Sequence, residues 1–434
     1  MSPSNGQDLV YDVRMSSVVP ASITGGNVVH QLSNMDLAMK LHYLRAVYYF
    51  KSDAMVGHDI LSLKKPMFKW LDIYCSVAGR IRRSESGRPF IKCNDAGVRI
   101  FEAMCRVTVD EWLEMDDPSR HKLLVSNQVL GPQLQFSPLV YVQFTWFRCG
   151  GISVGLSWSH LIGDIFTASI FMNMWGQIMA GEPSIKTVHL PRTEVERPTK
   201  PASNPTIPLS VKQVNNIGDE WLPANACTMS TCSFHITDIQ LKHLRSKISY
   251  QTGSFEAISA LFWQCVARIR EEKEPKMVTV CRNDSNAKGS GILINNQVIS
   301  TVKTDSHVAN AELSELAALI AGGTMDESKE IEEMVESDDK SADLIIYGAN
   351  LTFVNLEGVD CYGLEMKGQK PISVYFGIDG VGDEGTVLVL PGPVDGGCDG
   401  GAHGGRMVTV ILLENQVSLL RKELEGEWCA AGIY

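Results

Sequence analysis

Six prolines fall between Pro183 and Pro208, and this segment restricts the possible folds of the chain more than any other feature. Proline removes a backbone donor and fixes φ, so such a stretch neither continues a helix nor fits inside a sheet. The chain has 434 residues, too many for one ordinary hydrophobic core. We therefore expect an N-terminal domain over 1–182, a proline-rich crossover linker over 183–210 and a C-terminal domain over 211–434.

Hydrophobic periodicity predicts helices and strands on both sides of this linker. Helices are expected over LSNMDLAMKLHYLRAVYYF, after the caps Ser33 and Asn34, and over SFEAISALFWQCVARIR and ENQVSLLRKELE. In the first of these, the apolar stripe consists of Leu37, Leu41, Leu44, Val47 and Tyr48. Strands are expected at RPFIKC, VRIFEA, NLTFVNL, TVLVLPG and MVTVILL. The elements alternate without strict βαβ order, so the expected class is α/β with a mixed sheet.

The segment PLVYVQFTWFRCGGISVGLSWSH predicts two strands joined at residues 149–151. In the second strand, large residues at even positions from Ile152 to His160 alternate with small residues at odd positions. Such alternation places His160 at the end of a buried face. The small residues on the opposite face are Ser153, Gly155, Ser157 and Ser159. This face would allow another backbone or a ligand to approach closely.

Beyond His160 the apolar residues follow helical spacing, so Asp164 falls at or just before the start of a helix. The apolar positions of this helix are Ile165, Ala168, Met172, Trp175 and Met179. A histidine at a strand-to-helix junction can face a cleft, where desolvation favours the neutral imidazole that accepts a proton. His160 is therefore a candidate catalytic base. Two plainer interpretations stay open, in which His160 is a core histidine and Asp164 only caps the helix.

Other motifs predict no second site. The sequence GVGDEG, residues 380–385, matches a dinucleotide-binding pattern, but a strand follows it and its two carboxylates would repel a pyrophosphate. We expect a hairpin turn there. The basic residues Arg80, Arg82, Arg83 and Arg88 are expected on a solvated hairpin, in preference to an anion site. No group of His, Cys and Asp has zinc spacing, so we expect no metal.

Charge and cysteine usage narrow the partners and the compartment. The chain has 39 Lys and Arg against 50 Asp and Glu, a net charge of −11, which argues against nucleic-acid binding. Its eleven cysteines form no Cys-x-x-Cys pair and the N-terminus lacks an apolar signal, so reduced thiols in the cytoplasm are expected. No apolar run reaches the roughly eighteen residues of a membrane span, so any association with a membrane would be peripheral.

An ordered set of blocks resembles the plant BAHD acyltransferases over nearly the whole chain. The blocks are LSNMDLA, VAGRIRRSESGRPFIKCNDAGVRIFEA, FTWFRCGGISVGLSWSHLIGD, SFEAISALFWQCVARIR and GTVLVLPGPVDGG. The resemblance implies two chloramphenicol-acetyltransferase-like domains with mixed sheets, joined by a crossover loop, and a monomeric fold. It also implies acyl-CoA as a co-substrate without a bound cofactor, His160 as the general base and Asp164 as a structural support.

The second family signature departs from its pattern. The family has Asp-Phe-Gly-Trp-Gly before Lys-Pro, whereas this chain has EMKGQ, residues 365–369, before Lys370-Pro371. Met366 and Gly368 stand in the places of the two aromatic residues. The Tyr-Phe-Gly-Asn block appears as ILINNQ, and Ile165 replaces the glycine that usually follows the motif aspartate.

A narrower resemblance is to the eceriferum and Glossy wax proteins, a BAHD branch with a degenerate second signature. RMSSVVPAS, MDLAMKLHYLRAVYYF, HLIGDIF and YGANLTFVNLEG carry it. The branch implies a role in cuticular wax formation, promoting very-long-chain fatty acyl-CoA elongation with an elongase condensing enzyme at the endoplasmic reticulum. Two hypotheses follow: a protein that modulates the condensing enzyme, or an acyl-CoA-dependent O- or N-acyltransferase that uses His160.

Overall fold

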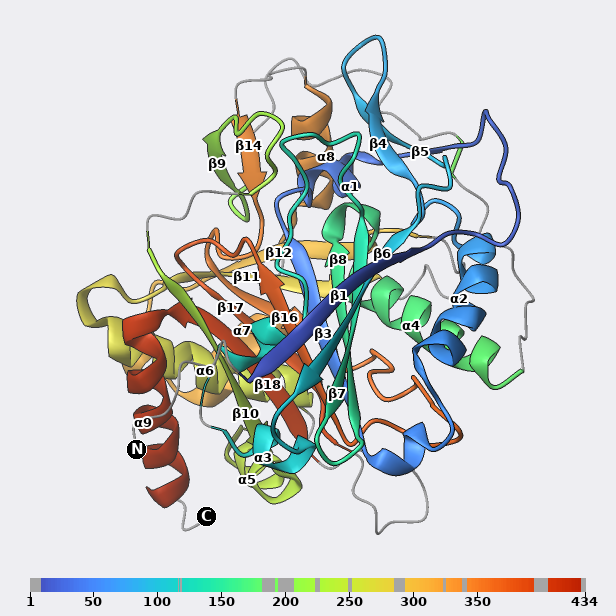
Figure 1. The fold of residues 1–434 in the computed structure, drawn as a ribbon. Coiled ribbons are helices and arrows are strands. Elements are labelled where there is room, and N and C mark those ends of the chain that lie inside the picture. Colours follow the sequence, from blue (N-terminus) through green and yellow to red (C-terminus); the bar gives the residue numbers. More distant parts are fainter. Residues whose placement is uncertain are drawn as a thin grey trace.

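A computed structural model of the chain has two large mixed sheets together with helices (Figure 1). It describes residues 9–115, 117, 119–181, 192–193, 207–222, 227–248, 252–284, 293–322, 325–337, 342–393 and 405–430. Most of the predicted linker at 183–210 lies outside these residues, so the proposed division into two domains stays a prediction. The ten cysteines within the described residues are free thiols.

The first sheet is built mainly from the first half of the chain. In spatial order its strands are β1 (Val10–Val18), β6 (Val98–Cys105), β7 (Val140–Phe147), β8 (Ile152–Ser159), β3 (Tyr43–Phe50) and β16 (Ser373–Asp379). The pair β6 and β7 is parallel and the others are antiparallel. The last strand comes from the second half of the chain, so this sheet is completed by residues more than three hundred positions from its first strand.

The second sheet belongs to the second half of the chain. Its strands, in spatial order, are β10 (Met229–Ile236), β18 (Arg406–Leu413), β17 (Thr386–Pro391), β15 (Leu351–Asn355), β11 (Met277–Asn283), β12 (Gln297–Lys303) and β13 (Met325–Asp326). Two smaller sheets are formed by β2 (Val29–Gln31), β5 (Pro89–Lys92) and β4 (Arg80–Arg83), and by β9 (Lys212–Asn215) with β14 (Ala342–Ile345). The strands predicted from the sequence are therefore present.

Nine α-helices are present among the described residues. They are α1 (Asn34–Ala38), α2 (Ile60–Ile73), α3 (Val109–Leu113), α4 (Ile165–Met179), α5 (Asp238–Ile248), α6 (Ser254–Arg270), α7 (Leu313–Gly322), α8 (Ser328–Glu336) and α9 (Glu414–Ala430). In the view of Figure 1, α2 and α4 lie at one side of the molecule and α6 and α9 at the other. α4 packs on the first sheet through Trp175, whose ring lies 5.7 Å from that of Phe144 on β7. α6 packs against the second sheet, and one apolar core joins Trp158 of β8 to Cys281 of β11.

The helix predicted over residues 32–50 is present only at its start, and the prediction is wrong beyond Ala38. The capping residue Ser33 starts α1 as expected, with a capping box to Asp36, but this helix ends at Ala38. The following residues form β3, which lies between β8 and β16 and is buried at every position. A strand covered on both faces is apolar throughout, and part of such a run matches helical spacing.

Two turn predictions also need correction. Residues 380–385 do not form a hairpin, because they connect β16 of the first sheet to β17 of the second. The arginine hairpin exists as β4 and β5, but it is only partly solvated. Arg80 is buried and donates to the carbonyl of Gly79, and Arg88 donates to the carbonyl of Leu32 and the side chain of Asn34.

The small face of β8 is in contact with another backbone segment, as its sequence predicted. Ser157 Oγ donates to the carbonyl of Ser126 at 2.6 Å. A Cβ atom on Gly155 would lie 1.9 Å from the carbonyl oxygen of Leu124. Glycine is therefore required at this position of the strand, because a real side chain would push residues 124–126 away.

Gly155→Ala is expected to lower the free energy of unfolding by about 1–3 kcal/mol, the cost of overpacking a rigid interior. Urea denaturation of both proteins measures this difference. Ser153→Ala is the matched control on the same face of β8, because its buried hydroxyl has no hydrogen-bond partner among the described residues and its loss should cost far less. Equal stability of Gly155→Ala and wild type would contradict the close approach.

Candidate functional site

His160 and Asp164 lie where β8 gives way to α4, as the change of period predicted. His160 begins a short 3₁₀ turn over His160–Ile162, and Asp164 is the N-cap of α4. The backbone N–H of His160 donates to the carbonyl of His42 at 3.1 Å. The histidine is thus fixed between the ends of two central strands, with its side chain completely buried.

Both carboxylate oxygens of Asp164 bind backbone groups. One accepts a hydrogen bond from the N–H of Thr167 at 2.9 Å, and the other from the N–H of Asn296 at 3.2 Å. Burial raises the pKa of Asp164, and the hydrogen bonds from Thr167 and Asn296 oppose that rise. The side chain caps α4 and holds the segment before β12 to it, an arrangement suited to support.

The imidazole of His160 is bonded to a tyrosine. Its Nε2 lies 3.0 Å from the hydroxyl of Tyr347, which in turn lies 2.6 Å from Oε1 of Gln297. An amide oxygen only accepts, so the single hydroxyl hydrogen points to Gln297 and the hydroxyl oxygen accepts from His160. Nε2 therefore carries the proton in this arrangement. Burial lowers the pKa of His160 to about 4, so the ring is neutral near pH 7.

A second buried histidine, His42, supports the same tyrosine. Its Nε2 accepts hydrogen bonds from the backbone N–H groups of Ile346 and Tyr347 at 3.1 and 3.4 Å. Its ring centre lies 4.9 Å from that of Tyr347 and 6.4 Å from that of His160. Burial, and then the charge that His160 would carry, lower the pKa of His42 to about 3. Tyr347 is thus fixed from both its backbone and its hydroxyl.

Asp36 ties three distant segments together beside His160. Its carboxylate accepts from Asn295 Nδ2 at 2.9 Å and forms an ion pair with Arg192 at 2.8 Å. The same Nδ2 of Asn295 donates to the carbonyl of His160 at 2.8 Å. The backbone N–H of Arg192 donates to Nδ1 of His30 at 3.1 Å. One of the described residues of the predicted linker is therefore bound to the site.

The second-signature segment packs without aromatic rings. Met366 is completely buried in the core shared by the two sheets, in a tight turn where its N–H and carbonyl pair with Gln369. Lys367 and Gly368 have φ values of 52° and 72°. The segment contacts α4, since a Cβ on Gly176 would lie 3.0 Å from the carbonyl oxygen of Glu365. Met366 thus places a flexible thioether where the family signature has its first aromatic residue. Gly368 places a turn without a side chain where the signature has its second.

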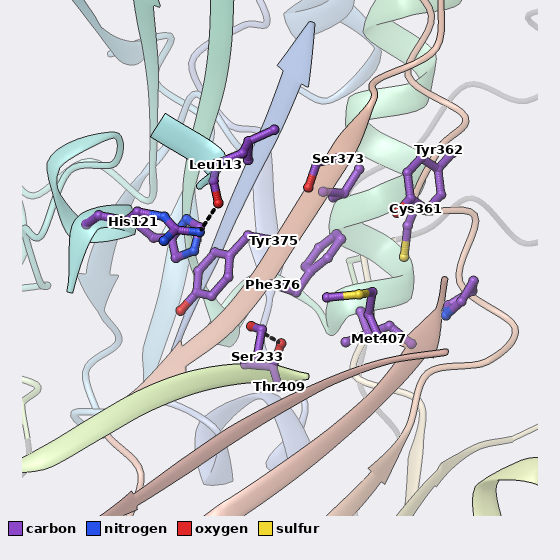
Figure 2. A pocket seen from close by; sticks show the side chains of 14 residues that line it. Leu113, His121, Ser233, Cys361, Tyr362, Ser373, Tyr375, Phe376, Met407 and Thr409 are labelled. Atoms are coloured by element: carbon purple, nitrogen blue, oxygen red, sulfur yellow. Dashed lines mark hydrogen bonds between the residues drawn. The ribbon is translucent and has the colours of Figure 1, made fainter. Parts of the chain in front are cut away.

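A cavity of about 80 Å³ lies between β16 and the strands β10 and β18 (Figure 2). Tyr375 and His121 stack beside it with ring centres 3.9 Å apart, and Ser233 and Thr409, paired on β10 and β18, bond to each other on one wall at 3.3 Å. His160 does not line this cavity. Its volume is well below the roughly 300 Å³ of a small ligand pocket, so it does not accommodate an acyl-CoA.

The sequence predicted His160 and Asp164, and the structure brings them together at the junction. It did not predict a role for His42, Tyr347, Gln297 or Asn295, although the last two lie in the segment ILINNQ that was compared with a family block. The one signal in the sequence for these residues was a polar side chain at the end of an apolar run. Tyr347 directly follows DLII, and His42 directly precedes YLRAV. Across the described ranges, no three His, Cys, Asp or Glu side chains form a possible metal site.

Comparisons with known proteins show which proteins this chain resembles. A family model described as the transferase family matches residues 11–341. Protein ECERIFERUM 2 of Arabidopsis thaliana is 40% identical to this chain. The alignment covers 96% of this chain and 98% of the ECERIFERUM 2 sequence. Protein ECERIFERUM 26 of the same plant is 36% identical, covering 97% and 96%. Fatty alcohol:caffeoyl-CoA acyltransferase of Arabidopsis thaliana is 31% identical but covers only 42% of this chain and 44% of its own.

Two solved structures show the fold. Vinorine synthase superposes with a TM-score of 0.71 at 16% identity, covering 94% of this chain and 96% of its own. F. graminearum TRI101, solved with coenzyme A and deoxynivalenol, superposes with a TM-score of 0.68 at 14% identity, covering 93% and 98%. The predicted α/β fold of chloramphenicol-acetyltransferase-like units with mixed sheets is confirmed.

Proposed function

Because this chain belongs to the BAHD acyltransferase family and to its eceriferum branch, we propose that it promotes very-long-chain fatty acyl-CoA elongation in cuticular wax formation. On this proposal the protein binds the condensing enzyme of a fatty acid elongase and changes the chain lengths that the enzyme accepts. It would do so in the cytoplasm, at the cytosolic face of the endoplasmic reticulum. Acyl-CoA would be handled within that complex.

The hydrogen bond between His160 and Tyr347 is the observation that carries this proposal. A general base needs a free lone pair within reach of the proton it removes. His160 Nε2 is bonded instead to the Tyr347 hydroxyl at 3.0 Å, and Gln297 fixes that hydroxyl. The lone pair of the ring is then on Nδ1, which has no hydrogen-bond partner among the described residues but is completely buried, out of reach of an acceptor. Tyr347 thus stands where an acceptor hydroxyl would have to stand. The replaced second signature points the same way, because Met366 and Gly368 supply no aromatic packing.

A second candidate function is acyl transfer from acyl-CoA to an alcohol or amine. The position of His160 at a strand end, with Asp164 capping the next helix, favours it. In this reaction the acceptor attacks the thioester carbonyl while His160 takes its proton, and CoA leaves as the thiol once protonated. This chemistry requires the imidazole to exchange Tyr347 for the acceptor.

Co-expression with an elongase condensing enzyme in yeast distinguishes the two functions. We expect wild type and His160→Ala to shift the acyl chains to greater length equally, because the histidine performs no proton transfer. Gas chromatography of the fatty acids measures the shift. If His160 is a general base, the variant should instead lose about 100- to 10,000-fold of the activity.

Tyr347→Phe is the companion variant, because it removes only the hydroxyl that occupies His160. Purified wild type and both variants are incubated with very-long-chain acyl-CoA, and free CoA is measured. We expect release to be at background in wild type and in His160→Ala. Release of CoA by wild type that disappears in His160→Ala would favour acyl transfer and contradict the proposal. The absence of any chain-length shift in yeast would also contradict the proposal.

A further inference from the structure

The helix α2 has an inner face that is fully used in packing. Its buried side chains include Leu63, Met67 and Trp70, and the ring of Trp70 stacks on Phe171 of α4 at 3.8 Å. The Trp70 indole N–H also donates to the carbonyl of Phe171 at 2.7 Å. This inner face explains why α2 is held at the margin of the molecule, where Figure 1 shows it outside α4.

The outer face of α2 combines apolar and basic side chains. Leu61 is 69% exposed and Phe68 is 40% exposed, although both are large and apolar. Positions 61, 65 and 68 follow helical spacing and lie on one side of the helix. Lys65 lies between the two apolar residues on this face, and Lys69 is exposed beside them. These residues do not take part in the packing of the core, because α2 packs through its opposite face.

Two segments next to α2, one bonded to it and one just before it in the chain, also expose large apolar side chains. Ile23 is 93% exposed, and its loop is fixed to α2 because the N–H of Ala21 donates to the carbonyl of Phe68 at 3.1 Å. The N–H of Ser22 donates to Asp72 at 2.8 Å, so the carboxylate at the end of α2 is engaged. Val56, shortly before the helix, is 65% exposed. We call Ile23, Val56, Leu61, Lys65, Phe68 and Lys69 the α2 surface.

The carboxylates next to this surface are hydrogen-bonded to other groups and form no ion pair with its lysines among the described residues. Asp59 accepts from the backbone N–H of Ser62 and caps α2, and Asp72 holds the loop of Ser22. No ion pair to Lys65 or Lys69 is present among the described residues. This face of α2 thus combines two exposed lysines with aliphatic and aromatic side chains. This combination complements a surface of anionic headgroups above acyl chains.

We propose that the α2 surface binds the face of a lipid bilayer that contains anionic lipids. Leu61, Phe68, Ile23 and Val56 enter the boundary between headgroups and acyl chains, while Lys65 and Lys69 contact lipid phosphates or carboxylates. The contact is peripheral, since no helix within the described ranges is long and apolar enough to cross a membrane. This inference extends the proposed function by giving the protein its own contact with the membrane, and it is tested apart from any elongase.

Vesicle flotation with the purified full chain tests the proposal. The vesicles are pure phosphatidylcholine or phosphatidylcholine mixed with phosphatidylserine. We expect wild type to bind the mixed vesicles and to be released by high salt. Each lysine near an anionic surface contributes about a fivefold change in partition, so Lys65→Glu with Lys69→Glu should weaken binding at least about 25-fold. Leu61→Ser with Phe68→Ser should also weaken binding, because less apolar area enters the bilayer.

The matched control lies on α9, which also exposes an apolar residue near a lysine. Leu419 is 44% exposed and Lys422 is exposed, so Leu419→Ser with Lys422→Glu makes one substitution of each kind elsewhere. This control should bind mixed vesicles like wild type, and circular dichroism should show that every variant is folded. Wild type that fails to bind mixed vesicles, or α2 variants that bind as wild type does, would overturn the proposal.

The yeast experiment separates this inference from the proposed function. If wild type does not bind vesicles but the α2 variants lose the chain-length shift, the surface contacts a protein and the bilayer proposal is wrong. If wild type binds vesicles through α2 and yet shifts no acyl chains, the bilayer contact stands and the proposed function fails.

Discussion

Acidification from about pH 7 to about pH 5 is expected to lower the free energy of unfolding by several kcal/mol, because three buried histidines and the half-buried His121 are held in neutral form. They are His30, His42, His121 and His160, whose pKa values burial lowers to about 4, 3, 3 and 4. Above the ordinary value of 6.5, neither the folded nor the unfolded chain protonates them. At neutral pH these histidines therefore do not reduce the free energy of unfolding.

Between pH 6.5 and about 4 only the unfolded chain binds these protons, so stability falls as the pH falls. Each histidine contributes about 1 kcal/mol per pH unit in this window. Two carboxyl groups act in the opposite sense, because burial raises the pKa values of Asp164 and Glu332. Their effect grows only toward the acidic end, and four histidines outweigh it above about pH 5.

Urea denaturation at a series of pH values measures the slope. His121→Phe is the informative variant, since a phenyl ring can keep the stacking on Tyr375 but cannot bind a proton. The free energy of unfolding of this variant should change less steeply with pH than that of wild type. The difference corresponds to about one proton fewer bound on unfolding. A stability that is constant across this range would contradict the neutral state of the four rings.

Asp36→Ala is expected to lower the free energy of unfolding by about 3–5 kcal/mol, the usual cost of leaving one member of a buried ion pair alone. The carboxylate of Asp36 is 1% exposed, and its removal leaves Arg192 and Asn295 without their shared acceptor. The N–H of Ser33 also loses its partner in the capping box of α1. The result should be a loosened site as well as a less stable protein.

The exposed ion pair of Arg83 and Asp219 is the matched control. Both side chains are about half exposed, and such pairs contribute about 0–1 kcal/mol, so Asp219→Ala should change little. Denaturant melts of the two variants give the comparison directly. If Asp36→Ala costs no more than Asp219→Ala, then Asp36 does not tie the three segments together as its contacts indicate.

The part of the fold with clear periodicity was predictable from the sequence. The alternation before His160 gave the strand β8, and the change of spacing after it gave α4 with Asp164 at the cap. The small residues of β8 indicated a close backbone, which the contact of Gly155 with Leu124 explains. These features depend on neighbours within a few residues, where local pattern and packing agree.

The predictions failed where a strand is buried on both faces and shows no alternation, or where the contacting residue lies far away in the sequence. β3 is covered on both faces, so its residues show no alternation and the run imitates a helix. Residues 380–385 have the composition of any tight turn, and nothing in them indicates that the flanking strands belong to different sheets. Tyr347 lies 187 positions from His160, so only the completed fold brings the two together.

The strand β16 makes the first half of the chain dependent on the second. A polypeptide that stops before Ser373 leaves the full length of β3 as an unpaired apolar edge, with backbone donors and acceptors open to other chains. Ribosomes must therefore finish most of the protein before its first sheet can close. Premature stop codons far downstream of His160 would thus yield aggregates in place of a working N-terminal lobe.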